Sequence, residues 1–266
     1  MLTGFSYASH AIQGAREAQE DACSFASMNG SATRPLRRHG ARRAATLLAV
    51  LADGMGGHAG GAEASRTACE GFLAAYEGGD GAPRSRLAGA LDASNRAISA
   101  ALQRDRGLEG MGCTLVGAAF TPDGLSWVSV GDSPLYLFRQ DRLYQLNEDH
   151  SLAPVLDRLA AQGEMSVAEA ETHPRRHFLR AALTGQSIEL VDLSPAVLPL
   201  RAGDWVVIAS DGIEVLSHSE LADILAGHAG EGPQALAGAI LSAIEAKADP
   251  NQDNATVMAV QPVFAG

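Results

Sequence analysis

The chain has 266 residues, of which 46% are hydrophobic and 19% are charged, a balance that is typical of a folded globular protein and excludes disorder over its whole length. Its 20 Lys and Arg against 31 Asp and Glu give a formal net charge of −11. A nucleic acid or an anionic membrane surface is therefore not an expected partner, and an anionic substrate would need a local cation.

The cysteines and the N-terminal residues indicate the cellular compartment to expect. Cys23, Cys69 and Cys113 are widely spaced and form no CxxC pair, so neither a disulfide framework nor a zinc knuckle is expected. The first residues lack a basic stretch followed by an apolar run, and no apolar run approaches the roughly 20 residues that span a bilayer. We expect a cytoplasmic protein.

The apolar patterns predict strands and helices that pack against each other. Short runs rich in Val, Ile and Leu predict strands at 46–52, 114–120, 125–130, 134–138, 205–210 and 255–261. Helical spacing of apolar residues predicts helices over 61–76, 87–102 and 236–244. Strands follow one another over 112–146 without a helix between them, so antiparallel sheets with packed helices fit better than a parallel βαβ sheet. Without repeats or linkers, residues 1–266 read as a single domain.

One segment, residues 31–43 (SATRPLRRHGARR), contains five arginines and no acid. We interpret it as a solvated hairpin tip between the strand after Asp21 and the strand before Asp53, and a docking patch for an acidic partner is the alternative. At about 3.3 Å per residue the tip lies roughly 20 Å from those two acids. These arginines are therefore not expected to bind a substrate phosphate.

Five acidic residues stand at the ends of apolar runs. Asp53, Asp132 and Asp211 each close a run, and Asp21 and Asp253 each open one. In antiparallel sheets the end of one strand lies beside the start of its neighbour, so these acids can gather at one edge. Clustered carboxylates repel one another, whereas hard divalent ions such as Mg²⁺ and Mn²⁺ favour oxygen ligands. The sequence predicts a divalent metal site.

The sequence lacks the motifs that are typical of other phosphate-binding and acyl-transfer sites. Gly54 follows Asp53 and lets the backbone approach an ion, and its carbonyl can itself be a ligand. The spacing of the acids is wrong for an EF-hand, and there is no P-loop, G-x-S-x-G elbow or H-E-x-x-H helix. The glycine-rich GMGGHAGG stretch at 54–61 has no P-loop lysine.

A set of motifs in a fixed order covers nearly the entire chain. They are REAQED (16–21), LLAVLADGMGGHAGGAEAS (47–65), MGCTLVGAAF (111–120), VSVGDSPLYLF (128–138), EDHSLAPVL (148–156), HPRRHFLRAALTG (173–185), VVIASDGIEVLS (206–217) and QDNATVMAV (252–260). The sequence resembles the bacterial form of the metal-dependent serine/threonine protein phosphatases of the PP2C type. The resemblance implies an α+β fold, a four-layer α-β-β-α sandwich of two antiparallel sheets flanked by helices, with a flap subdomain at about 147–187.

The resemblance also implies roles for single residues. Asp53 bridges two Mn²⁺ or Mg²⁺ ions, the carbonyl of Gly54 binds one of them, and Asp211 and Asp253 bind the other. The remaining acids are Asp21 and Glu20, which lie in or just outside the ligand set, and Asp132, which helps to hold a weaker third ion. Arg16 matches the family's phosphate-binding arginine, whose guanidinium grips phosphate oxygens bidentately.

The sequence departs from the family pattern at three positions. Met55 stands where eukaryotic members have a histidine thought to act as general acid. His58 is a candidate to assist in its place, with orientation of the loop as the alternative. Val215 stands where many relatives place an aspartate of the third metal site, so that ion would bind weakly or use Glu214 and water. Gln19 stands where asparagine is frequent.

Three histidines, His150, His173 and His177, fall in the predicted flap. Their spacing disfavours zinc and favours a role in the flap or in substrate contact. The expected function is hydrolysis of phosphoserine and phosphothreonine in proteins by a water that bridges two ions, opposing a Ser/Thr kinase. We expect the protein to be a monomer. The alternatives are a catalytically weak phosphoprotein-binding regulatory module on the same fold, and a small-molecule or sporulation-type phosphatase.

Overall fold

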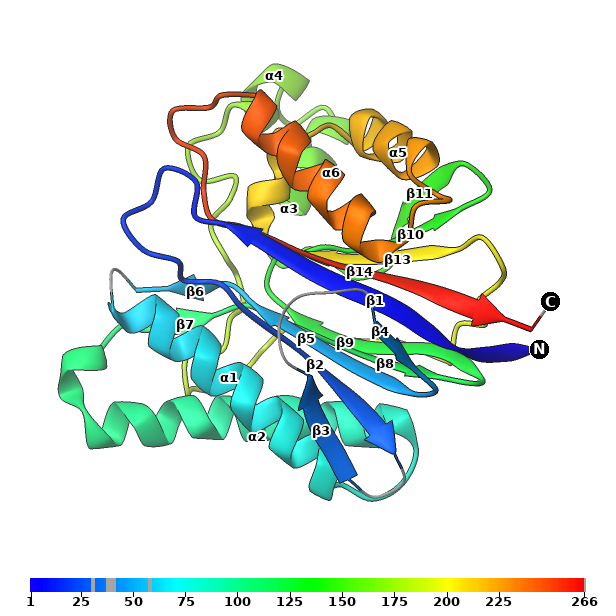
Figure 1. The fold of residues 1–266 in the computed structure, drawn as a ribbon. Helices are drawn as coiled ribbons and strands as arrows, with labels where there is room; N and C mark the ends of the chain where they lie inside the picture. Colours follow the sequence, from blue (N-terminus) through cyan, green and yellow to red (C-terminus); the bar gives the residue numbers. More distant parts are fainter. Residues whose placement is uncertain (30–31, 37–41, 57–58, 266) are drawn as a thin grey trace.

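Two six-stranded antiparallel sheets lie face to face (Figure 1). The structure, a computed structural model, describes residues 1–29, 32–36, 42–56 and 59–265. The first sheet has the order β11 (Arg142–Gln145), β10 (Leu135–Arg139), β13 (Trp205–Ala209), β14 (Ala255–Phe264), β1 (Leu2–Ile12) and β4 (Arg42–Ala44). The second has the order β12 (Asp192–Leu193), β9 (Gly124–Val130), β8 (Leu115–Thr121), β5 (Leu47–Ala52), β2 (Ala22–Asn29) and β3 (Ala32–Leu36).

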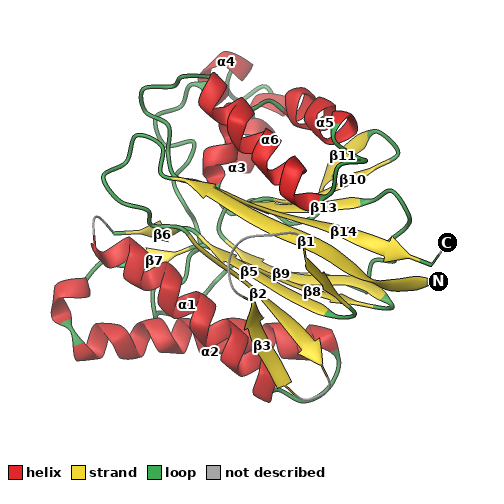
Figure 2. Ribbon diagram, viewed as in Figure 1, coloured by secondary structure: helices red, strands yellow, loops and turns green. Residues whose placement is uncertain are grey.

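Helices cover the outer face of each sheet (Figure 2). The pair α1 (Ala59–Gly78) and α2 (Pro83–Arg104) packs on the second sheet, and the pair α5 (His218–Gly227) and α6 (Pro233–Ala246) packs on the first. Two further helices, α3 (Ala153–Ala161) and α4 (Val167–Glu171), fall within the predicted flap at 147–187. The expected four-layer α-β-β-α sandwich is confirmed.

Three apolar layers hold the four structural layers together. Phe72 and Leu91 pack between the helices and the second sheet, Phe5 and Phe120 pack between the two sheets, and Trp205 packs under α6. All six residues of β5 are buried because this strand has a helix layer on one face and a sheet on the other. Burial on both faces explains why β5 reads as a continuous apolar run and not as an alternating one.

The six predicted strands are confirmed as β5, β8, β9, β10, β13 and β14, and the three predicted helices as α1, α2 and α6. Strand β1 was not predicted, because small and polar residues interrupt its apolar pattern, whereas β2 confirms the strand expected directly after Asp21. No helix among the described residues is both long and apolar enough to cross a membrane.

The arginine-rich segment differs from the single hairpin tip expected of it. It contributes β3, which pairs with β2 at the edge of the second sheet, and β4, which pairs with β1 at the edge of the first. The segment thus extends both sheets, because β2 and β1 each leave one side free for a further strand. Residues 37–41, which include Arg37 and Arg38, lie outside the described residues.

A small two-stranded sheet lies beside the two main sheets. Strand β6 (Gly54–Met55) pairs with β7 (Gly112–Cys113), and Cys113 pairs in turn with Leu183. The three segments form a small ladder, which we call the β6–β7–Leu183 ladder. It begins directly after Asp53 and therefore adjoins the candidate site.

Candidate metal centre

Strand register brings the predicted acids to one end of the sandwich. Ala22 pairs with Ala52, so Asp21 and Asp53, each one residue further out, leave their strands side by side. Strands β13 and β14 pair up to Ala209 and Val257, so Asp211 and Asp253 extend beyond the same end of the first sheet. Asp132 follows β9.

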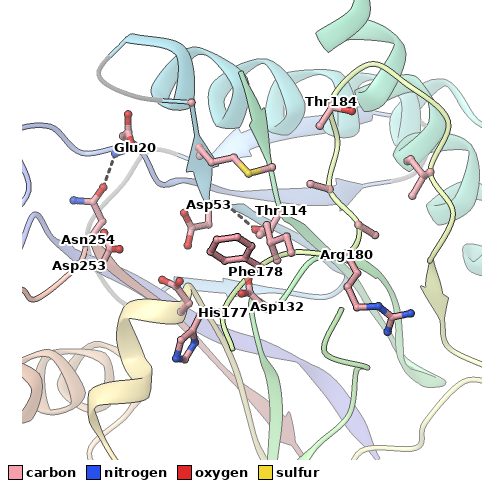
Figure 3. Close-up of a pocket in the computed structure, with 18 of the residues that line it drawn as sticks. Glu20, Asp53, Thr114, Asp132, His177, Phe178, Arg180, Thr184, Asp253 and Asn254 are labelled. Atoms are coloured by element: carbon pink, nitrogen blue, oxygen red, sulfur yellow. Dashed lines mark hydrogen bonds between the residues drawn. The ribbon is translucent and has the colours of Figure 1, made fainter. Parts of the chain in front are cut away.

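A cavity of about 830 Å³ opens where these strand ends meet (Figure 3). The predicted residues that line it are Arg16, Glu20, Asp53, Gly54, Asp132, Asp211 and Asp253, and Met55 lines it as well. Of the predicted set, Asp21 lies beneath the lining and His58 lies outside the described residues.

Burial and mutual repulsion raise the pKa values of the acids in this cluster. Burial first, and then the charges of Asp211 and Asp253, raise the pKa of Asp21 to about 6. Burial and the charge of Asp211 raise the pKa of Asp132 to about 8. Burial followed by neighbouring carboxylates also raises the pKa of Asp53 and of Asp211. A cluster in which each carboxylate disfavours ionisation of the next is neutralised by protons or by a cation.

Thr114 fixes the main chain of Asp53. The N–H of Asp53 donates to the Thr114 hydroxyl at 3.0 Å, and the N–H of Thr114 donates to the carbonyl of Asp53 at 2.8 Å. The Thr114 hydroxyl also bonds the Ser133 hydroxyl at 2.7 Å, one residue after Asp132. This chain of bonds connects the loops that carry the two acids.

Asp21 is held from the first sheet. The hydroxyl of Ser210 donates to Asp21 Oδ2 at 2.8 Å and accepts from the N–H of Thr256 at 2.9 Å. Ser210 is fully buried and directly precedes Asp211. The two sheets are therefore joined at the site by a bond to one of its acids.

Arg16 places a cation beside the clustered acids. It forms an ion pair with Asp253, and its side chain is 55% exposed and lines the cavity. Asn254 fixes the loop that carries it by accepting a hydrogen bond from the N–H of Glu20 at 2.7 Å. The guanidinium thus keeps donor groups available to a ligand in the cavity.

The donor set fits a hard divalent cation. Glu20 Oε1 and Asp21 Oδ1 are buried and have no hydrogen-bond partner among the described residues. At Gly54 a Cβ atom would lie 2.2 Å from the carbonyl oxygen of Gly61 and 2.6 Å from that of Glu20, so only glycine fits. Oxygen donors around a glycine backbone are the chemistry that Mg²⁺ and Mn²⁺ prefer. In the metal-free arrangement of the described residues, no three Asp, Glu, His or Cys side chains are already gathered closely enough to hold a metal ion.

The histidines of the predicted flap have separate partners. His150 is buried, and its Nδ1 accepts from the N–H of Gly131 at 3.2 Å, next to Asp132. His173 Nδ1 accepts from the N–H of Arg175, and His177 lies 3.6 Å from Glu214. These contacts do not gather the three rings around one ion. His177 and its neighbour Phe178 line the cavity.

Sequence reasoning missed the residues that position the acids. Thr114, Ser133, Ser210 and Asn254 are buried polar residues at the site. The DNAT motif contained a signal for Asn254, since a buried asparagine next to a clustered acid needs partners for its amide. Ser133 carried the same kind of signal, because it directly follows the acid Asp132. The hydroxyl of Thr114 has no such signal, because its partner is 61 residues away.

The fold and the site define the class of protein. The sequence model described as protein phosphatase 2C matches residues 37–231. This range includes Asp53, Asp132 and Asp211 and excludes Arg16 and Asp253. The chain belongs to the protein phosphatase 2C family.

Named relatives agree with this assignment. The serine/threonine protein phosphatase PstP of Mycobacterium tuberculosis is 36% identical over 173 residues, 64% of this chain and 32% of PstP, so this chain matches about a third of that relative's length. Protein phosphatase PhpP of Streptococcus pneumoniae is 32% identical over 192 residues, 70% of this chain and 76% of PhpP. The PstP catalytic domain in complex with two manganese ions has a TM-score of 0.72 at 29% identity, covering 98% of this chain and 99% of that one.

Proposed function

We propose that this chain is a metal-dependent protein phosphatase that hydrolyses phosphoserine and phosphothreonine. The observation that carries the proposal is the cavity in which Asp53, Asp211 and Asp253 meet with Arg16 beside them. The phosphatase names of PstP and PhpP, and the two manganese ions in the PstP structure, support it. A small cluster of acids without Arg16 would suit a structural ion, whereas an arginine beside them suits an anionic substrate.

The carboxylates supply the ligands for Mn²⁺ or Mg²⁺. Asp53 is the proposed bridge between two ions, and Gly54 contributes its carbonyl to one of them. Asp211 and Asp253 are the proposed ligands of the other. Asp21 and Glu20 complete or surround this set, and Asp132 is the proposed ligand of a weaker third ion. Two divalent cations, when bound, lower the pKa of a water molecule and neutralise charge on the phosphate, so that no nucleophilic side chain is required.

The remaining site residues bind the phosphate, orient the binding group or hold the acids in position. Arg16 binds two phosphate oxygens through its planar guanidinium, and the ion pair with Asp253 orients that group toward the cavity. The Thr114 and Ser210 hydroxyls keep Asp53 and Asp21 at fixed positions. Met55 has no proton to give, so the leaving alkoxide takes its proton from water or from His58, the proposed assisting residue.

The proposed substrates are phosphorylated proteins, and a cognate Ser/Thr kinase is the proposed counterpart. The acidic chain has no predicted nucleic-acid or membrane partner, and we propose that it acts as a monomer in the cytoplasm. The choice between Mn²⁺ and Mg²⁺ rests with the ions that the cell supplies, because an all-oxygen donor set accepts both.

The test is hydrolysis of p-nitrophenyl phosphate and of a phosphothreonine peptide with Mn²⁺, with EDTA, and by Asp211→Asn. We expect turnover that needs the metal and that falls by at least about 100-fold in the variant. Asp223→Asn, an exposed acid on α5, is the control and should keep its activity. Absence of turnover in a folded, Mn²⁺-loaded wild-type protein would contradict the proposal and favour the phosphoprotein-binding module.

A further inference from the structure

The β6–β7–Leu183 ladder has one side without a neighbouring strand. Cys113 and Leu183 exchange both main-chain hydrogen bonds, at 3.0 and 2.9 Å, so the N–H and C=O of Leu183 point toward β7. The C=O and the N–H of one planar trans peptide point in opposite directions. The C=O of Ala182 and the N–H of Thr184 therefore face away from β7, and no hydrogen bond within the described part of the chain uses them.

This unpaired edge adjoins the site cavity. Ala182 and Thr184 line the cavity that Asp53 lines from the other end of the ladder, and Ser187 and Ile188 line it further along. Figure 3 shows Asp53, then Thr114, then the segment from Arg180 to Thr184 in this order across the cavity. Unpaired main-chain groups beside a cavity are a template for an added strand.

The edge is also held in place before any ligand binds. Leu183 is fully buried. At the end of the edge, Asn95 on α2 accepts from the N–H of Gly185 at 2.8 Å and donates to the carbonyl of Gln186 at 2.6 Å. Gly185 has φ +75° and packs against Ser99, so the turn after Thr184 fits glycine only. Fixing the edge in advance reduces the entropy that binding must overcome.

We infer that the main chain of the phosphoprotein substrate, next to its phosphorylated residue, pairs as an additional β-strand with Ala182 and Thr184. This inference rests on the proposed phosphatase function. Three strand spacings of about 4.8 Å separate β6 from the added strand. That distance is longer than a phosphothreonine side chain, so the paired residues are neighbours of the phosphorylated residue in the substrate sequence.

Pairing through the main chain has a consequence for specificity. Backbone hydrogen bonds select an extended conformation and not a side chain, whereas side-chain pockets select a sequence. Ala181 and Ala182 add little bulk beside the edge, which leaves room for a substrate backbone. The site is therefore expected to accept phosphorylated segments of varied sequence, provided that they are unfolded or extended locally.

The test uses the full chain with Mn²⁺ and phosphothreonine nonapeptides that each carry one N-methylated amide. N-methylation removes a donor and blocks strand pairing. We expect KM to rise at least 10-fold for methylation of the one amide that donates to the carbonyl of Ala182, and to change less than twofold for methylation at the next position along the peptide. KM values within twofold for every methylated peptide would overturn the inference. Failure to hydrolyse even the unmodified peptide would instead contradict the proposed function.

A protein variant gives an independent test of this edge. Asn95→Ala releases the turn at Gly185, and the ratio of kcat/KM for the peptide to kcat/KM for p-nitrophenyl phosphate should fall at least fivefold. Asp92→Ala, at an exposed position on the same helix, is the matched control and should leave this ratio within twofold. An unchanged ratio in Asn95→Ala would count against a preformed edge.

Discussion

Asn254 accepts a hydrogen bond from the main-chain N–H of Glu20 at 2.7 Å, although 234 residues separate the two in sequence. The same side chain donates to the carbonyls of Gln13 and Ala18 at 2.7 and 3.0 Å. All three bonds go to the loop that carries Arg16 and ends at the site. Asn254 therefore positions the loop that carries Arg16 against the start of β14, where Asp253 lies (Figure 3).

Asn254→Ala should weaken both the site and the fold. The substitution leaves several buried main-chain groups without partners, and we expect the free energy of unfolding to fall by about 2–4 kcal/mol in urea titrations. Because the residue orients others and touches no substrate, kcat/KM should fall by about 10- to 100-fold, with a weaker apparent affinity for Mn²⁺. Asn251→Ala, at an exposed position nearby, is the control. An equal loss in both variants would contradict the positioning role.

Arg16→Lys tests the shape of the cation separately from its charge. Lysine keeps the charge but loses the planar pair of donors, so KM for a phosphothreonine peptide should rise by about 10-fold. Arg84→Lys on α2 should behave like the wild type. Steady-state kinetics at saturating Mn²⁺ measure the effect. A KM that stays at the wild-type value in Arg16→Lys would show that Arg16 does not bind the phosphate.

The clustered acids predict how the stability of the metal-free protein depends on pH. Burial above all raises the pKa of Asp132 to about 8, whereas an exposed aspartate titrates near about 3.9. Between these values the folded state holds more protons than the unfolded state, so stability falls as the pH rises, by about 1.4 kcal/mol per pH unit for this group. Urea titrations in EDTA at pH 5, 6.5 and 8 should show the decline.

Two further measurements identify the source of this pH dependence of stability. Asp132→Asn should flatten the pH dependence, and Asp123→Asn, at an exposed position, should not. Mn²⁺ at pH 8 should restore stability because it binds the folded state. A slope in Asp132→Asn that equals the wild-type slope would mean that this carboxyl does not titrate differently in the folded protein.

The arginine-rich segment should be dispensable for chemistry. Strand β2 runs from Ala22, beside the site, to Asn29, which pairs with Ala32 of β3. At about 3.3 Å per residue that end lies roughly 26 Å from Asp21. Replacing the five arginines of residues 31–43 with glutamine should leave turnover of p-nitrophenyl phosphate within twofold. A large fall in that turnover would place the segment at the site.

The sequence determined those features that depend on local patterns. Apolar runs such as LLAVLA and WVVIA are strands because a chain segment buried on both faces has no room for polar side chains, and the acids that close or open them mark the strand ends. The spacing of Leu87, Leu91 and Ile98 predicted α2 for a similar local reason. The order of the motifs around Asp53, Asp211 and Asp253 was sufficient to indicate the family.

The tertiary structure decided what depends on the register between distant segments. The pairing of Ala22 with Ala52 places Asp21 beside Asp53, and the partners of Asn254 and Thr114 lie far away in sequence, where no periodic pattern can show them. The free edge at Ala182 and Thr184 is of the same kind. A hydrogen-bond group is used or left unpaired according to which strand lies beside it, and that neighbour is chosen only when the whole chain packs.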